Sequence, residues 1–200
     1  MSSPVVTLYY VPRSRATRAR WALEELGVPY RLVRLDSASK DVWRAEHLAR
    51  HPLGRVPVLE TPDGMLFESV AICLHLAANT PLLPVDGSRS RALVHQWLFF
   101  AVTELEGLLG RFAGERNKAS PDAGRVAHLR GKLEAPLLAL EGALREREWL
   151  VDASFTVADL VVGALLVWAS RLELLTALPT ARAFAARVVE RPAYQRAMAD

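Results

Sequence analysis

The chain has 200 residues, of which 51% are hydrophobic and 24% are charged, with a formal net charge of +3. This length allows a substantial core, and the composition lies outside that of disordered chains, which combine low hydrophobicity with high net charge. The basic residues are scattered between acidic neighbours and form no concentrated patch, so the sequence does not favour nucleic-acid binding.

Membrane-spanning, secreted and disulfide-stabilised classes are also disfavoured. The longest apolar stretch without a formal charge covers residues 160–170, which is shorter than the about 20 residues that a spanning helix needs. The apolar run at residues 5–11 is broken at once by Pro12, unlike a secretory signal. The one cysteine, Cys73, excludes an internal disulfide and a cysteine-based zinc site. We therefore expect a cytoplasmic protein with no membrane partner.

Strand and helix patterns alternate in the first 80 residues. In chain order, the sequence predicts a strand at residues 5–11, a helix with Ala16, Ala19, Leu23 and Leu26 on one stripe, and a strand at 30–35. A helical stretch follows in the interval that contains Trp43 and Leu48, and then come strands at 56–59 and 65–67 and a helix at 69–78. Gly27 is the predicted end of the first helix, and residues 61–64 have the turn chemistry of a hairpin. This order predicts an α/β unit, in which helices cover a small mixed sheet.

The second part of the chain is predicted to be entirely helical. Residues 79–88 contain two prolines and a glycine and indicate a linker. The predicted helices beyond the linker cover residues 89–115, 121–148, 156–174, 180–190 and 192–199. The helix at 156–174 is almost entirely apolar and is expected at the centre. Thr156 at its start and Asp159 three residues later predict a capping box.

A first candidate site lies where the first strand passes through Pro12 into the first helix. Ser14 stands at the start of this helix, where unsatisfied N–H groups and a partial positive charge favour an anion. Four basic side chains nearby oppose the helix dipole, which suggests a bound negative group; they are Arg13, Arg15, Arg18 and Arg20. A simple N-cap role for Ser14 and solvated surface arginines are the alternatives.

Pro57 opens a predicted strand and marks a second candidate site. Proline cannot donate to a strand ladder, so it is expected either at a sheet edge or in a cis bond at a bend. A cis bond would leave the backbone N–H and C=O of Val56 free to pair with an extended peptide. An edge proline without function is the alternative.

Glu68 and Ser69 form a third candidate site, where the last predicted strand meets a helix. The N–H of Ser69 is suited to a carboxylate, and Glu68 is suited to an ammonium group, so the pair fits the α-amino acid end of a ligand. Helix capping by Ser69 and solvation of Glu68 are the alternatives.

Four segments in register resemble the cytosolic glutathione transferases, and in particular serine-type bacterial members close to the theta and delta classes. They are L-Y-Y-V-P-R-S at residues 8–14, G-R-V-P at 54–57, E-S-V-A-I at 68–72 and F-T-V-A-D at 155–159. The resemblance implies a thioredoxin-like glutathione-binding domain at residues 1–80 with a mixed four-stranded sheet, a linker at 81–88, and an all-α domain at 89–200, in a homodimer.

The resemblance also implies roles for the candidate residues. Ser14 would donate a hydrogen bond to the glutathione sulfur, with Tyr10 as the alternative hydroxyl. Val56, followed by a cis Pro57, would pair with the cysteinyl unit. The other implied glutathione contacts are Arg55 with the glycyl carboxylate, and Glu68 and Ser69 with the γ-glutamyl end.

The implied function is transfer of the glutathione thiolate to an apolar electrophile, in the manner of a detoxifying enzyme. Glutathione would be the co-substrate, and no metal is expected because the histidines show no ligand spacing. The sequence has no cysteine near Ser14, unlike relatives that reduce disulfides, and His51 stands where the family often has asparagine. A glutathione-dependent isomerase or peroxidase, or a non-catalytic binding protein of the same fold, are the alternatives.

Overall fold

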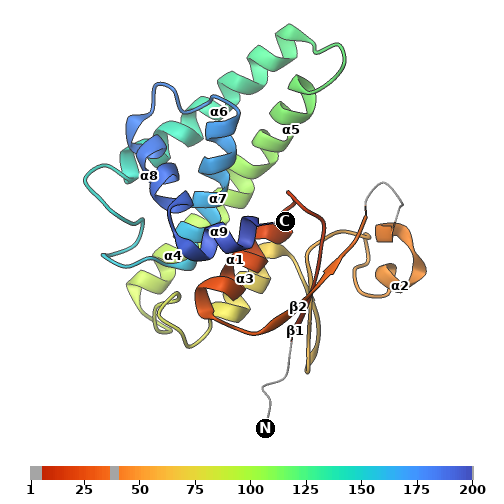
Figure 1. Cartoon of the computed structure of the whole chain (residues 1–200). Helices are drawn as coiled ribbons and strands as arrows, with labels where there is room; N and C mark the ends of the chain where they lie inside the picture. Colours follow the sequence, from red (N-terminus) through yellow and green to blue (C-terminus); the bar gives the residue numbers. More distant parts are fainter. Residues whose placement is uncertain (1–5, 37–40, 200) are drawn as a thin grey trace. The chain divides into compact units, whose positions relative to one another are not determined.

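The computed structural model describes residues 6–36 and 41–199 (Figure 1). The chain divides into two compact units. One contains the residues up to Thr80 together with those from Arg191 onward, and the other is Pro81–Glu190. The final helix therefore does not belong to the helical unit, in contrast to the predicted assignment of residues 89–200 to one domain.

The first unit is an α/β structure around a four-stranded mixed sheet. Its elements are β1 (Val6–Tyr10), α1 (Ala16–Leu26), β2 (Tyr30–Arg34), η1 (Asp41–Trp43), α2 (Ala45–Leu48), β3 (Val58–Thr61), β4 (Gly64–Phe67), α3 (Ser69–Ala77) and α9 (Pro192–Met198). The strand order is β2-β1-β3-β4, with β1 and β2 parallel and the other two pairs antiparallel. This confirms the predicted mixed sheet and the hairpin between β3 and β4.

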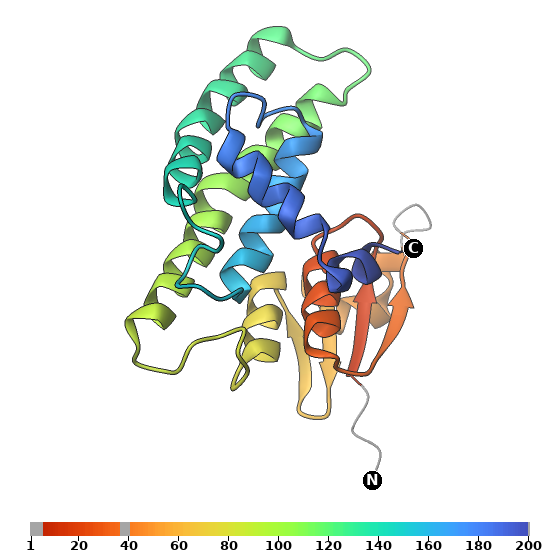
Figure 2. The ribbon, with the colours of Figure 1, turned by 60° about the vertical axis from the view of Figure 1, so that its left-hand side comes forward.

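Helices α1 and α3 pack against each other on the sheet, and α9 lies beside α1 (Figure 2). Ala16, Ala19 and Leu23 on one face of α1 are buried together with Leu8 of β1 and Leu59 of β3. The helix ends at Gly27, which has a φ of 62° and donates its N–H to the carbonyl of Leu23. Glycine adopts this left-handed conformation without a Cβ penalty, so the predicted helix end is confirmed.

Strand β3 begins at Val58, two residues later than predicted. The Val56–Pro57 peptide bond is cis, one of the two arrangements expected for this proline. Pro57 has no N–H to donate to the sheet, so the ladder starts only after it.

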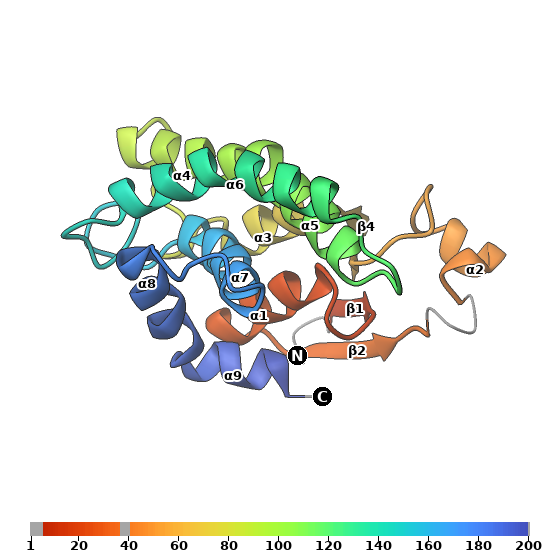
Figure 3. The ribbon, with the colours of Figure 1, turned by 90° about the horizontal axis from the view of Figure 1, so that it is seen from above.

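The second unit consists of helices packed around α7. Its elements are α4 (Arg89–Phe100), η2 (Ala101–Glu106), α5 (Gly107–Arg116), α6 (Ala123–Ala143), α7 (Val157–Arg171) and α8 (Pro179–Val189). Helix α7 lies between α8 and α4 (Figure 3). A Cβ on Gly163 would lie 2.8 Å from Cγ2 of Val188, so the absence of a side chain there lets α7 and α8 pack closely. Within the described ranges, no helix is both long and apolar enough to cross a membrane.

The predicted capping box at the start of α7 is confirmed. The backbone N–H and the hydroxyl of Thr156 both donate to Oδ2 of Asp159, at 2.8 and 2.9 Å. The other carboxylate oxygen, Oδ1, accepts the N–H of Leu150 at 2.7 Å, which ties the preceding loop to the helix. Burial raises the pKa of Asp159 to about 6, although these hydrogen bonds favour its ionised form.

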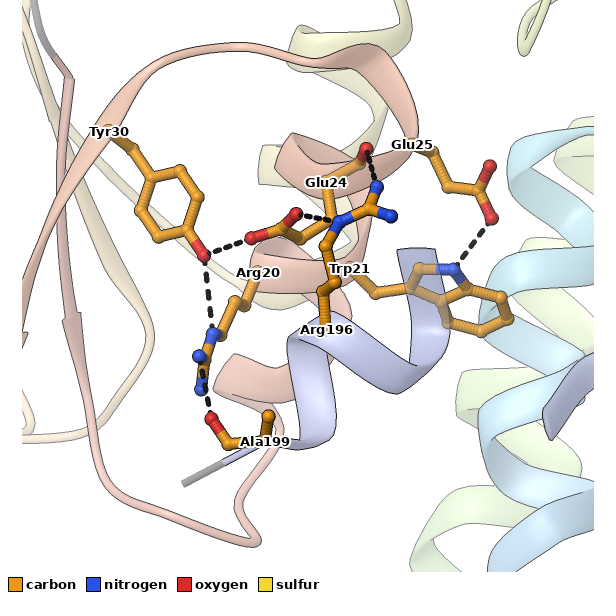
Figure 4. A network of polar contacts seen from close by, with 7 residues as sticks. All are labelled: Arg20, Trp21, Glu24, Glu25, Tyr30, Arg196 and Ala199. Atoms are coloured by element: carbon orange, nitrogen blue, oxygen red, sulfur yellow. Dashed lines mark hydrogen bonds and ion pairs between the residues drawn. The ribbon is translucent and has the colours of Figure 1, made fainter. Parts of the chain in front are cut away.

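Side-chain contacts to α1 explain why α9 joins the first unit (Figure 4). Nε of Arg196 donates to a carboxylate oxygen of Glu24 at 2.7 Å. The ring of Tyr194 packs edge-on against Trp21, with centroids 5.1 Å apart. These contacts join positions far apart in the sequence, and no local pattern in residues 192–199 indicates which helix they pack against.

Arg20 takes part in the same network. Its Nε donates to the hydroxyl of Tyr30 at 3.2 Å, and its Nη2 donates to the carbonyl of Ala199 at 2.9 Å. The Tyr30 hydroxyl in turn donates to Glu24 at 2.6 Å (Figure 4). Arg20 is thus a structural arginine that connects α1, β2 and the end of α9.

Candidate active site

Ser14 lies half-buried in the turn that leads from β1 into α1. Its hydroxyl donates to the carbonyl of Val11 at 2.6 Å, and its Oγ accepts the N–H of Ala16 at 3.2 Å. The side chain therefore satisfies a backbone donor at the helix start. To donate to a ligand sulfur, the hydroxyl hydrogen must turn away from Val11. This requires only rotation about the Cβ–Oγ bond of Ser14.

Tyr10, the alternative hydroxyl, is the last residue of β1 and is buried. Its side chain belongs to the core cluster that includes Leu8 and Ile72, and the guanidinium carbon of Arg20 lies 5.8 Å from its ring centroid. This is the packing expected of a strand aromatic. Tyr10 is thus packed in the core, whereas Ser14 is half-buried.

The segment from Arg55 to Pro57 is held by a histidine that the sequence reasoning did not single out. His47 in α2 is only 2% exposed, and its Nε2 lies 2.9 Å from the carbonyl oxygen of Arg55. A carbonyl only accepts, so this nitrogen carries the hydrogen. Over the described ranges, no backbone hydrogen bond joins Val56 to another residue. Its peptide groups are therefore available to an extended ligand.

Glu68 has an unusual backbone conformation, with φ 71° and ψ 115°. Such angles are costly for a residue other than glycine, and strained residues of this kind cluster at ligand-binding sites. The Glu68 side chain is exposed, and Ser69 beside it is buried. Helix α3 begins at Ser69, so the alternative role of the Ser69 side chain as a helix cap is not observed. The N–H of Ser69 lies in the first turn, where helix donors are unpaired.

His51 shows how this chain tolerates a histidine at the position where the family often has asparagine. Its Nδ1 accepts the N–H of Leu53 at 3.0 Å and closes the turn, and its ring lies 4.8 Å from that of Phe67. Burial lowers the pKa of His51, and the nearby charge of Glu68 acts in the opposite direction. The folded state thus favours the neutral ring of His51, whose Nδ1 is free of a hydrogen and accepts the N–H of Leu53.

The four arginines near α1 do not form one anion site. Arg13 and Arg15 are exposed, and Arg20 belongs to the α9 network. Arg18 is different, because it is only 4% exposed and its Nη1 lies 3.4 Å from Oγ of Ser69. Arg18 thus contacts the third candidate site, at Ser69, and not Ser14.

Cysteine and metal chemistry find no support among the described residues. Cys73 in α3 is 0% exposed, and burial raises the pKa of its thiol to about 12. It packs as a small buried hydrophobic residue. The part of the chain that the structure covers holds no group of three or more His, Cys, Asp or Glu side chains arranged to bind a metal ion.

Comparison with known proteins places both units in one family. The family model described as glutathione S-transferase, N-terminal domain, matches residues 4–78, and that described as glutathione S-transferase, C-terminal domain, matches residues 92–192. The chain belongs to the glutathione S-transferase family. This confirms the family and the two-part fold expected from the sequence.

Individual relatives extend over nearly the whole chain. It is 33% identical over 199 residues to glutathione S-transferase GstA of Escherichia coli O157:H7, which covers 96% of each chain. It is also 29% identical over 204 residues to the disulfide-bond oxidoreductase YfcG of Escherichia coli strain K12, covering 97% of this chain and 94% of YfcG. A crystal structure of a glutathione transferase family member from Pseudomonas fluorescens pf-5, with two glutathione bound, matches with a TM-score of 0.89 at 25% identity and covers 98% of this chain and 92% of that one.

Proposed function

We propose that this glutathione S-transferase activates glutathione through Ser14 and transfers its thiolate to an apolar electrophile. The observation that carries the proposal is the half-buried hydroxyl of Ser14 at the N-terminus of α1. A thiol with a pKa of about 8.5 is only a few per cent ionised at neutral pH. Lowering that pKa by about 2 units requires about 2.7 kcal/mol of preferential stabilisation of the anion.

One charge-assisted hydrogen bond supplies a free energy of this size. Such bonds contribute about 1.5 to 3 kcal/mol, and the positive end of α1 adds to the effect. The Ser14 hydroxyl exchanges its bond to Val11 for a bond to the thiolate, so the exchange leaves one carbonyl to be solvated. The proposed role is therefore sufficient in magnitude without a metal or a protein base.

The remaining candidate residues would hold the tripeptide. The free peptide groups of Val56 suit the cysteinyl unit, and the N–H of Ser69 with the carboxylate of Glu68 suits the γ-glutamyl carboxylate and ammonium. Arg55 is exposed, and its guanidinium would pair with the glycyl carboxylate. His47 would act indirectly, because it fixes the carbonyl of Arg55 next to Val56.

The chemical step is a displacement. The thiol proton leaves to solvent, the thiolate sulfur forms a bond to an electrophilic carbon, and the leaving group departs with the electron pair of the broken bond. Ser14 keeps its own proton throughout and stabilises the sulfur anion before attack. Its main effect is therefore to raise the fraction of bound glutathione that is ionised.

A homodimer in the cytoplasm is part of the same proposal. Large apolar side chains are exposed on the first unit at Leu53 (55%), Met65 (41%) and Phe67 (41%). Exposed apolar groups of this kind are typical of protein–protein contacts. They support a second copy of the chain as the partner.

Disulfide reduction through a cysteine of this chain is disfavoured, although one relative is named for such an activity. The chain has one cysteine, and its thiol is buried with a pKa raised to about 12. A buried neutral thiol is a poor nucleophile. Reactions that use the glutathione thiolate in another way, such as isomerisation or peroxide reduction, share the Ser14 site and differ in the second substrate.

The test is conjugation of glutathione to a dinitro-substituted aryl chloride. Ser14→Ala should lower kcat/KM by at least about tenfold with an unchanged circular dichroism spectrum, because one anion-stabilising donor is lost. Tyr10→Phe serves as the control and should keep the rate. An unchanged rate in Ser14→Ala would refute the role of Ser14, and no conjugation by the wild type would favour a non-catalytic binding protein.

A further inference from the structure

Arg18 is a buried arginine at the edge of the proposed glutathione site. It lies four residues after Ser14 in α1 and is 4% exposed. Removing a guanidinium from water costs several kcal/mol unless nearby groups compensate. An arginine at this position thus calls for a functional or structural reason.

The guanidinium lies against the first turn of α3. Its Nη1 is 3.4 Å from Oγ of Ser69, and its positive charge is close enough to Cys73, one turn later, to oppose the effect of burial on the thiol pKa. The N-terminal end of a helix is itself positive, and basic groups are unfavourable there. Both the helix and Arg18 therefore favour an anion at Ser69.

The hydrogen bond also determines what the Ser69 hydroxyl is able to do. A guanidinium only donates, so Oγ of Ser69 is the acceptor in this contact. The hydroxyl hydrogen of Ser69 cannot go to Arg18 and remains available for a different acceptor. A ligand carboxylate beside the start of α3 would meet both this hydrogen and the Ser69 N–H.

We propose that Arg18 is a positioning residue for the γ-glutamyl carboxylate of glutathione. It orients the Ser69 hydroxyl toward the ligand and adds positive charge beneath the carboxylate. The inference rests on the proposed glutathione site, and it assigns to Arg18 the recognition of one particular group of the tripeptide. Arg18 thereby contributes to selectivity for γ-glutamyl compounds that carry this carboxylate.

The experiment compares two probes by calorimetry. One is glutathione, and the other is the analogue in which the γ-glutamyl unit is replaced by γ-aminobutyryl, which lacks only that carboxylate. Arg18→Met should weaken glutathione binding by about tenfold, the effect of one charge-assisted contact, and leave analogue binding nearly unchanged. Arg18→Lys keeps the charge and should retain part of the preference for glutathione.

Arg20→Met is the matched control, because Arg20 is a second buried arginine of α1 whose partners are Tyr30 and Ala199. It should lower the melting temperature and leave the ratio of the two dissociation constants unchanged.

Equal weakening of both probes by Arg18→Met would overturn the proposal and make Arg18 structural. If Arg18→Met does not fold, Arg18→Lys is the deciding variant. A ratio of the two dissociation constants equal to that of the wild type would then refute the proposal. Failure of the wild type to bind either probe would refute the glutathione site itself, a distinct result.

Discussion

Arg191 and Glu25 lie 166 positions apart and form a two-pronged ion pair, with Nε–Oε1 at 2.6 Å and Nη2–Oε2 at 2.8 Å. The indole N–H of Trp21 donates to the same carboxylate at 2.8 Å. The pair lies where the chain returns from the helical unit to the first unit. It holds the start of α9 against α1, the helix whose N-terminus carries Ser14.

Arg191→Met should therefore destabilise the first unit. The expected loss is about 1 to 3 kcal/mol, because two charge-assisted bonds are removed from a mostly buried carboxylate. The measurement is the free energy of unfolding by urea. Arg44→Met is the matched control, since Arg44 pairs with Asp41 but is 67% exposed, against 27% for Arg191, and its loss should be below about 1 kcal/mol. Equal losses in the two variants would show that the Arg191 pair does not hold α9.

The strained backbone at Glu68 predicts a conflict between stability and binding. Glu68→Gly should raise the free energy of unfolding by about 1 kcal/mol, since relief of a strain of about 1 to 3 kcal/mol exceeds the entropy cost of glycine. The same change should weaken glutathione binding, because the carboxylate for the ammonium group is lost. Glu134→Gly, at an exposed position inside α6, is the control and should be destabilising by about 1 kcal/mol. Destabilisation of similar size in both variants would contradict this explanation.

Burial of His51 predicts an acid-sensitive first unit. Because the pKa of His51 is lowered in the folded state, the unfolded state binds more protons below the usual histidine value of 6.5. The free energy of unfolding should fall as the pH drops through and below that value. His51→Asn keeps an acceptor for the N–H of Leu53 and does not titrate. The wild type should lose stability relative to this variant between about pH 7 and about pH 5, and parallel pH profiles would count against the prediction.

Asp159 predicts the opposite trend in the second unit. Its pKa is raised to about 6, so the folded state binds more protons than the unfolded state between the usual value of 3.8 and about 6. Measured relative to Asp159→Asn, the stability of the wild type should fall as the pH rises through this interval. The change should be at most about 3 kcal/mol. A difference that does not vary with pH would mean that the carboxyl is not buried as described.

Local signals predicted much of the fold. The capping box of Thr156 and Asp159 and the helix end at Gly27 depend on residues within a few positions of each other, so the sequence shows them directly. The packing of α9 on α1 depends on side chains that meet only in the folded chain, such as Arg191 and Glu25. The π-helical segment η2 also has no distinguishing pattern, because it continues a helical stretch without interruption.

The candidate site shows the same division. Ser14 and Ser69 stand at strand-to-helix junctions that a motif reveals. His47 lies in a short helix with no periodic signal, and its contact with the carbonyl of Arg55 forms only in the folded chain. The arginines near Ser14 looked equivalent in the sequence. Only the structure separates Arg20, which holds α9, from Arg18, which contacts Ser69.

Titration of the bound glutathione thiol, followed by the ultraviolet absorbance of the thiolate, tests the central role of Ser14 most directly. In the complex with the wild type, the thiol pKa should lie about 2 units below the usual value of about 8.5, and in the complex with Ser14→Ala it should return most of the way to that value. The same lowered pKa in both complexes would contradict the account.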